Sequence, residues 1–81
     1  MTLAILRLPF VKTCSGLSRS TLYLRIAQGL WPKPVKLGPR AVGWPESEVA
    51  RMNAARIAGK STEDIRQLVR DLEAARSQLV A

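Results

Sequence analysis

Apolar residues in the first 45 positions occur in short runs separated by glycine and proline, a pattern that predicts two short helices followed by a hairpin. Pro9 suits the first turn of a helix over about residues 9–15, and Gly16 suits its C-terminal end. Ser18 can cap a second helix, which meets no helix-breaking residue before position 29. Two short helices joined by a glycine-containing turn are typical of the helix-turn-helix motif.

The next segment, residues 30–44, is rich in proline and glycine and cannot form a helix. Apolar and polar side chains alternate around Lys36 and again before Trp44, as expected for the two arms of a β-hairpin. Between the arms, residues 38–41 form a turn with proline in second position, which places Arg40 at the tip. The helix-turn-helix is therefore expected to carry a small wing.

Two further helices are predicted after the hairpin. Pro45 opens the first, and acidic residues in its first turn favour this start because they interact with the helix dipole. Its apolar residues Val49, Met52 and Ile57 are expected to face the core. A glycine-lysine pair ends that helix, and Ser61, with an acid three residues later, starts the second.

The last predicted helix has an apolar residue alternately every three and four positions, which is the spacing of two coiled-coil heptads. These residues are Ile65, Leu68, Leu72, Ala75 and Leu79. The stripe fits a homodimer interface and docking onto the helix's own domain equally well, and two heptads are short for a coiled coil that forms unaided. The predicted fold is mainly α with a small β-hairpin wing: a winged helix-turn-helix domain over residues 5–58 and a C-terminal helix over 61–80.

Charge is distributed unevenly along the chain. All six acidic residues lie after position 45, so the first 45 residues carry the whole net charge of +7, and residues 46–81 balance six basic against six acidic groups. A basic surface often serves solubility alone, but seven cations with no acid nearby repel one another, and a bound polyanion offsets that repulsion. Nucleic acid fits better than a membrane surface, because the basic residues are spread over helices and hairpin instead of one amphipathic face.

The composition disfavours several classes of protein. The chain has no histidine and a single cysteine, Cys14, so no internal disulfide, metal-ligand set or nucleophile paired with a base is expected. Cys14 itself is expected to be a small core residue in a reducing cytosol. The apolar run at residues 3–6 is cut by Arg7 and Pro9, too early for a signal peptide or a spanning helix. These features favour a soluble, cytoplasmic, nucleoid-associated protein that is not an enzyme and needs no cofactor or metal.

Short motifs follow one another in a fixed order through the predicted domain. They are Arg7-Leu8-Pro9, Gly16-Leu17-Ser18-Arg19-Ser20-Thr21-Leu22-Tyr23, Pro34-Val35-Lys36-Leu37-Gly38 and Arg40-Ala41-Val42-Gly43-Trp44. With these motifs the chain resembles the AlpA family of prophage regulatory proteins. The resemblance implies a winged helix-turn-helix related to the MerR-like and excisionase folds, without a cofactor, that acts on DNA near phage integration genes.

The start of the second helix holds the candidate base-reading residues, because that helix enters the major groove in helix-turn-helix proteins. Arg19 is expected to bond a guanine, Ser20 can serve any base, and Tyr23 is expected to contact a base edge or a phosphate. Ser18 and Thr21 are also candidates, although both can satisfy free amides at the helix start, and Ser18 is expected to act more as a cap than as a contact.

Other basic residues are expected to hold the DNA backbone. Arg40, with Lys36 near it, is the candidate wing contact to a neighbouring minor groove or to the backbone. Arg25 is a candidate phosphate contact, although its order relative to the preceding leucine is the inverse of the one usual in the family. Trp31 and Trp44 are expected to anchor the core.

The function that these features favour is sequence-specific binding of double-stranded DNA by a transcriptional regulator of prophage or integrative-element genes. One alternative is an excisionase-like architectural protein that bends DNA and recruits an integrase. Another is a protein-interaction adaptor whose last helix binds a partner helix. The adaptor predicts partner binding that is insensitive to salt and little effect of Arg19→Ala.

Overall fold

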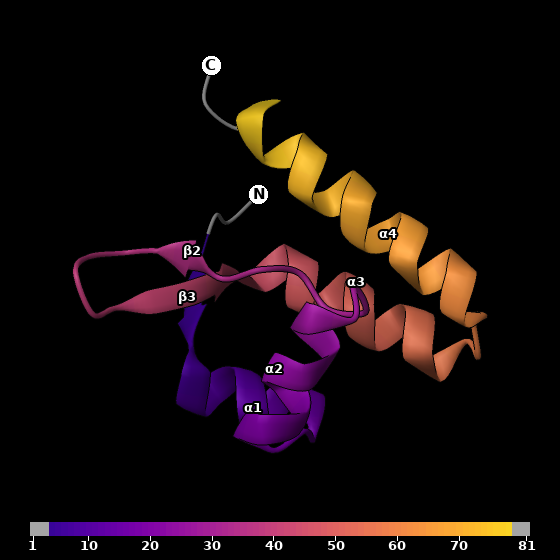
Figure 1. Cartoon of the computed structure of the whole chain (residues 1–81), viewed down its shortest axis with the longest axis horizontal. Coiled ribbons are helices and arrows are strands. Elements are labelled where there is room, and N and C mark those ends of the chain that lie inside the picture. Colours follow the sequence, from indigo (N-terminus) through magenta and orange to yellow (C-terminus); the bar gives the residue numbers. More distant parts are fainter. Residues whose placement is uncertain (1–3, 79–81) are drawn as a thin grey trace.

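Helices form most of the chain in the computed structural model, which describes residues 4–78 (Figure 1). The elements are β1 (Ile5–Arg7), α1 (Leu8–Ser15), α2 (Arg19–Ala27), β2 (Val35–Lys36), β3 (Val42–Pro45), α3 (Glu46–Ile57), α4 (Thr62–Ala75) and a short 3-10 helix, η1 (Arg76–Gln78). The predicted fold class, mainly α with a small wing, is confirmed. No helix within residues 4–78 is long and apolar enough to cross a membrane.

The α1–α2 turn follows the local signals in the sequence. Gly16 has a φ of 72°, a left-handed conformation that glycine adopts without strain, and its N–H donates to the Lys12 carbonyl to close α1. Ser18 then caps α2, since its Oγ accepts a hydrogen bond from the Thr21 N–H at 3.2 Å. The predicted helix-turn-helix and its Ser18 cap are therefore confirmed.

The small sheet has three antiparallel strands in the order β1-β3-β2, whereas the sequence predicted only the β2–β3 hairpin. The added strand β1 pairs Leu6 with Trp44 and Arg7 with Gly43. It escaped prediction because three residues are too few to show alternation and their partner lies more than 35 positions further along the chain. We define the wing as β2, β3 and the connecting loop at 37–41, which projects away from the helices (Figure 1).

A single apolar core joins the helices to the sheet. Its buried members are Val11, Leu22, Trp31, Trp44, Val49, Met52, Ala55, Ile65 and Val69. Both tryptophans are almost fully buried, as expected. The last two members belong to α4, which turns back over α3 (Figure 1), so the C-terminal helix docks on its own chain.

Two residues expected in the core are exposed instead. Ile57 is 86% exposed, because at 100° per residue it lies about 200° around α3 from the buried Ala55. Cys14 is exposed in the last turn of α1, one turn beyond the buried Val11. The expectation for Ile57 was wrong because its position around α3 faces away from the core, and the expectation for Cys14 was wrong because the last turn of α1 leaves it exposed.

The predicted stripe on α4 is only partly the face that packs inward. Ile65 is buried, and Leu68 and Leu72 pack against the core, but Ala75 is exposed and Val69, outside the stripe, is buried. The remaining stripe residue, at position 79, lies outside the described residues. The buried face follows the 3.6-residue period of a docked helix more closely than a strict heptad seam.

Candidate nucleic-acid interface

The first turn of α2 presents polar side chains on an open surface. A shallow depression of about 580 Å³ is lined by Ser18, Arg19, Ser20 and Tyr23. Ser18 is already engaged, because its hydroxyl donates to Thr21 Oγ1 at 2.9 Å in addition to capping the helix. Ser20 Oγ also takes part in this network, at 3.3 Å from Ser18 Oγ, so Arg19 and Tyr23 are the side chains of this turn best placed for an external partner, with Ser20 exposed beside them.

A second depression, of about 340 Å³, lies between the start of α1, α2 and the wing. It is lined by Arg7, Leu8, Pro9, Arg19, Tyr23, Lys36, Gly38, Pro39, Arg40 and Val42. We call it the basic hollow, because four of these side chains are cations and none is an acid. The fold thus brings together basic residues from β1, α2 and the wing.

Tyr23 links the basic hollow to the core. Its ring meets the buried Trp44 ring edge-on, with centroids 6.5 Å apart and planes at 70°. The guanidinium carbon of Arg19 also lies 5.6 Å from the Tyr23 ring centroid, within the range of a cation–π contact. Tyr23 therefore holds Arg19 over a rigid aromatic base.

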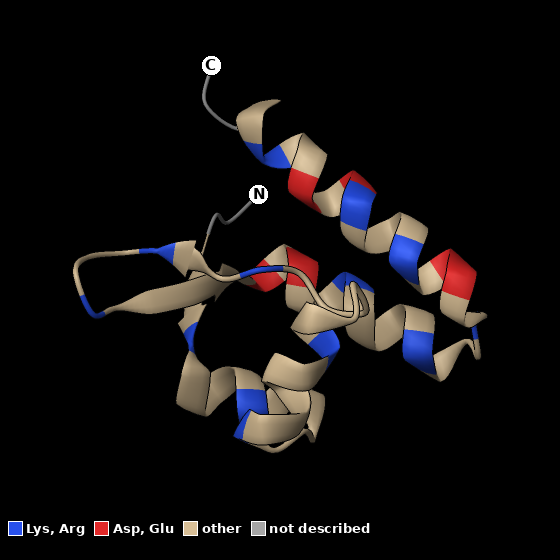
Figure 2. Ribbon diagram, in the orientation of Figure 1, with Lys and Arg blue, Asp and Glu red and all other residues tan. Residues whose placement is uncertain are grey.

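No acid neutralises this surface from within the N-terminal half. Figure 2 shows acidic ribbon only on α3 and α4, while basic residues extend over the helices and strands before them. The ion pairs within residues 4–78 are Arg66–Glu63 and Arg76–Glu48, both formed by cations after position 45. The cations of the N-terminal half are thus available to a bound polyanion, which would relieve their mutual repulsion.

The structure brings most of the predicted site residues together, but not all. Arg25 and Thr21 line neither depression. Thr21 is held in the local cap network, and Arg25 is half-buried nearly two turns further along α2. Conversely, Arg7 lines the basic hollow and was not among the predicted site residues. The sequence does show that Arg7 is one of the seven cations in the acid-free first 45 residues. Its place in the basic hollow, however, depends on the pairing of β1 with β3.

A helix-turn-helix followed by a wing, with a basic hollow between them, defines a winged helix-turn-helix protein. Residues 4–57 match the sequence profile of the family described as prophage CP4-57 regulatory protein (AlpA), and the chain belongs to this AlpA family. The family resemblance seen in the motifs is thereby confirmed. Helix α4 lies beyond the matched segment.

One curated relative is the uncharacterized protein ORF88 of Enterobacteria phage P4, which is 49% identical over 55 residues. The match covers 68% of this chain and 62% of the relative, so it spans less than two thirds of the relative's length. No solved structure matches the chain. The comparisons thus place the protein among phage-related regulators.

Proposed function

We propose that this protein is a sequence-specific, double-stranded DNA-binding regulator of transcription from prophage or integrative-element genes. The observation that carries the proposal is the basic hollow, where Arg7, Arg19, Lys36 and Arg40 converge without an acid. A groove of one charge sign attracts a polyanion over a distance and releases counterions from it on binding. Membership of a family of prophage regulatory proteins supports DNA as the polyanion.

In the proposed complex, the N-terminal turn of α2 enters the major groove. Arg19 bonds a guanine edge, Ser20 contacts a neighbouring base, and Tyr23 contacts a base edge or a phosphate. Ser18 keeps the free amides of the first turn ordered, so that this end of the helix also favours a phosphate. The cation–π contact of Arg19 with Tyr23 favours one orientation of the arginine and so reduces the entropy that it loses on binding.

The wing and β1 hold the backbone on one side of α2. Lys36 and Arg40 contact phosphates or the adjacent minor groove, and Arg7 contacts a phosphate between them and α2. Arg25 contacts a phosphate at the far edge of the groove, and Thr21 acts through the cap. Residues 5–58 would then be the DNA-binding domain of a cytoplasmic, nucleoid-associated protein, with residues 61–80 as its C-terminal helix.

The test is a fluorescence-anisotropy titration of a random 25-base-pair duplex at several salt concentrations. Neutralising about four to six phosphates gives a slope of log affinity against log salt of about −4 to −5. Arg40→Ala should weaken binding to every sequence and reduce the magnitude of the slope by about 1. The control Arg56→Ala removes the same charge from an exposed site on α3, outside the basic hollow, and should leave affinity nearly unchanged.

Sequence recognition is tested on an operator selected from a random DNA library. Arg19→Ala should reduce the preference for that operator over random DNA by about 1–3 kcal/mol, the value of one bidentate base contact. Binding that is absent at low salt, or flat with salt, would contradict the proposal and favour the adaptor. A sharp bend in the bound operator, measured by energy transfer between its ends, would instead favour the excisionase-like alternative on the same surface.

A further inference from the structure

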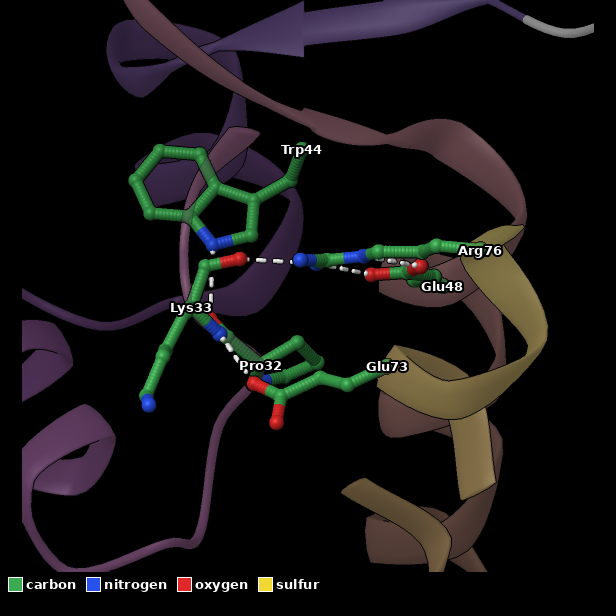
Figure 3. A network of polar contacts seen from close by, with 6 residues as sticks. All are labelled: Pro32, Lys33, Trp44, Glu48, Glu73 and Arg76. Atoms are coloured by element: carbon green, nitrogen blue, oxygen red, sulfur yellow. Dashed lines mark hydrogen bonds and ion pairs between the residues drawn. The ribbon is translucent and has the colours of Figure 1, made fainter. Parts of the chain in front are cut away.

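The segment that joins α2 to the wing is held by its main chain. We call residues 28–34 the connector. In Figure 3 the indole Nε1 of Trp44 donates to the Pro32 carbonyl at 2.9 Å, and the Lys33 N–H donates to Glu73 Oε2 at 2.8 Å. The Lys33 carbonyl accepts from Arg76 Nη2 at 2.7 Å. Both main-chain groups of Lys33 are therefore bound by residues at the C-terminal end of the described chain.

Arg76 is itself fixed by a buried carboxylate. Its Nε donates to Glu48 Oε2 at 2.8 Å and its Nη2 donates to Glu48 Oε1 at 2.6 Å, a bidentate arrangement that sets the plane of the guanidinium (Figure 3). Glu48 is only 4% exposed, and Arg76 donates both hydrogen bonds that its carboxylate accepts from side chains within residues 4–78. Arg76 thus ties α3 to the connector.

Arg76 carries its positive charge under physiological conditions. The hydrogen bond to the Glu48 carboxylate raises the pKa of Arg76, against the lowering effect of partial burial. Because the folded-state pKa is raised, the contribution of the Arg76 charge to stability is fully present at neutral pH and is lost as the pH rises through that pKa. Arg76 therefore keeps its charge, while the two hydrogen bonds to Glu48 set its orientation.

The connector joins α2 directly to β2, so it helps to set how the wing sits relative to α2, together with the pairing of β3 with β1. Only seven residues separate the two elements, and two of them, Pro32 and Pro34, have a restricted φ. Lys36, in the basic hollow, follows Lys33 by three positions. A shift of the Lys33 main chain would therefore move Lys36 and the wing loop with respect to Arg19.

We infer that Arg76, supported by Glu73, is a positioning residue of the DNA-binding surface, because it fixes the connector that sets the wing against α2. The inference rests on the proposed function. It makes α4 and η1, which lie beyond the segment matched by the family, a working part of the interface. Neither residue lines the basic hollow, so their effect on DNA is exerted through the wing.

The first variant is Arg76→Gln in the full chain, with Arg70→Gln as the control. Arg70 is exposed on α4, the helix that precedes η1, and its substitution removes the same charge without touching the connector. Arg76→Gln should weaken DNA binding about tenfold, the equivalent of roughly one lost hydrogen bond. The magnitude of the salt slope should also fall, by up to the value of about 1 expected for Arg40→Ala, because a displaced wing no longer delivers its phosphate contacts. Arg70→Gln should weaken binding less than about twofold.

A double-mutant cycle separates positioning from a loss of folded protein. Arg40→Ala should weaken binding much less in the Arg76→Gln background than in the wild type, because a displaced wing no longer delivers Arg40. Arg19→Ala should weaken binding equally in both backgrounds. A general loss of folded protein would leave both effects unchanged, and this additivity would overturn the inference. Circular dichroism at the titration temperature verifies that each variant is folded.

Where Arg76→Gln does not fold, Glu73→Ala takes its place in the same cycle, because it removes the acceptor for the Lys33 N–H and a negative charge near Arg76 but leaves both partners of the Arg76–Glu48 pair in place. Coupling with Arg40→Ala supports the inference, and additivity overturns it. If the wild-type protein binds DNA but the effects of the substitutions are additive, the inference is wrong and the proposed function still stands. If the wild-type protein does not bind DNA, both the inference and the proposed function are wrong.

Discussion

Trp31 and Trp44 are both buried indoles, but they differ in how the N–H group is satisfied. Trp44 Nε1 donates to the Pro32 carbonyl at 2.9 Å, whereas Trp31 Nε1 has no hydrogen-bond partner within residues 4–78. A buried polar group without a partner loses its hydration and gains nothing in return. The two side chains therefore make similar apolar contributions to the core, but the N–H of Trp44 stabilises the fold while the unpaired N–H of Trp31 destabilises it.

Substitution of each tryptophan by phenylalanine separates these contributions. Both changes remove the same volume, but Trp44→Phe also leaves the Pro32 carbonyl without this donor, while Trp31→Phe relieves an unpaired N–H. Trp44→Phe should lower the free energy of unfolding by about 1–3 kcal/mol more than Trp31→Phe. Urea denaturation followed by circular dichroism measures both values, and equal losses would contradict the role given to the Trp44 bond.

Among the elements, β3 is the most constrained, because it lies between β1 and β2. Gly43, in its middle, is buried, and a Cβ there would lie 2.6 Å from Ile5 Cγ2 and 3.0 Å from the Leu6 carbonyl oxygen. These distances are below van der Waals contact, and one of them involves main chain that cannot rotate away. The close pairing of β1 with β3, which carries Arg7 into the basic hollow, therefore depends on the absence of a side chain at position 43.

Gly43→Ala should lower the free energy of unfolding by about 1–3 kcal/mol, the usual cost of overpacking, because β1 or the wing must shift. Gly38→Ala is the matched control in the wing loop, where the nearest heavy atom, Ala41 Cβ, is 4.0 Å from the new Cβ. It should be close to neutral. Thermal unfolding of both variants tests the pair, and a stable Gly43→Ala protein would mean that β1 is not held as described.

Local signals predicted the elements well and contacts between distant residues poorly. Pro9, Gly16 and Ser18 fix helix ends through their own backbone and side-chain chemistry, so α1 and α2 were predictable to within a residue or two. The strand β1 and the location of Arg7 depend on pairing across the fold, which no local pattern encodes. The same applies to the inward face of α4 and to the Arg76–Glu48 pair, whose partners are 28 positions apart.

At the scale of the whole molecule, two halves with different charge share one core. The N-terminal half holds the uncompensated cations, and the C-terminal half supplies all the acids together with part of the apolar interior. Ile65 and Val69 of α4 are buried, and burial of each is worth about 1.5–3 kcal/mol. Their sum, about 3–6 kcal/mol, is a large part of the total stability of a small domain, about 5–15 kcal/mol.

A chain that ends at Lys60 should therefore lose cooperative unfolding, because it exposes the core beneath α4 and leaves the buried Glu48 carboxylate without Arg76. A chain that ends at Gln78 keeps every described contact and should unfold like the full chain. Thermal melts followed by circular dichroism compare them. A cooperative melt of the shorter chain at the wild-type temperature would show that α4 is dispensable for folding.

The hydrogen bonds of Glu73 and Arg76 with the connector also determine which residues position 33 can accept. Arg76 and Glu73 bind the main chain of Lys33, so the identity of its exposed side chain is irrelevant to them. The one residue they exclude is proline, which has no N–H to donate. In the sequence Pro32-Lys33-Pro34, position 33 is thus the only one of the three with a main-chain N–H to donate. Its side chain is free to vary without loss of these contacts.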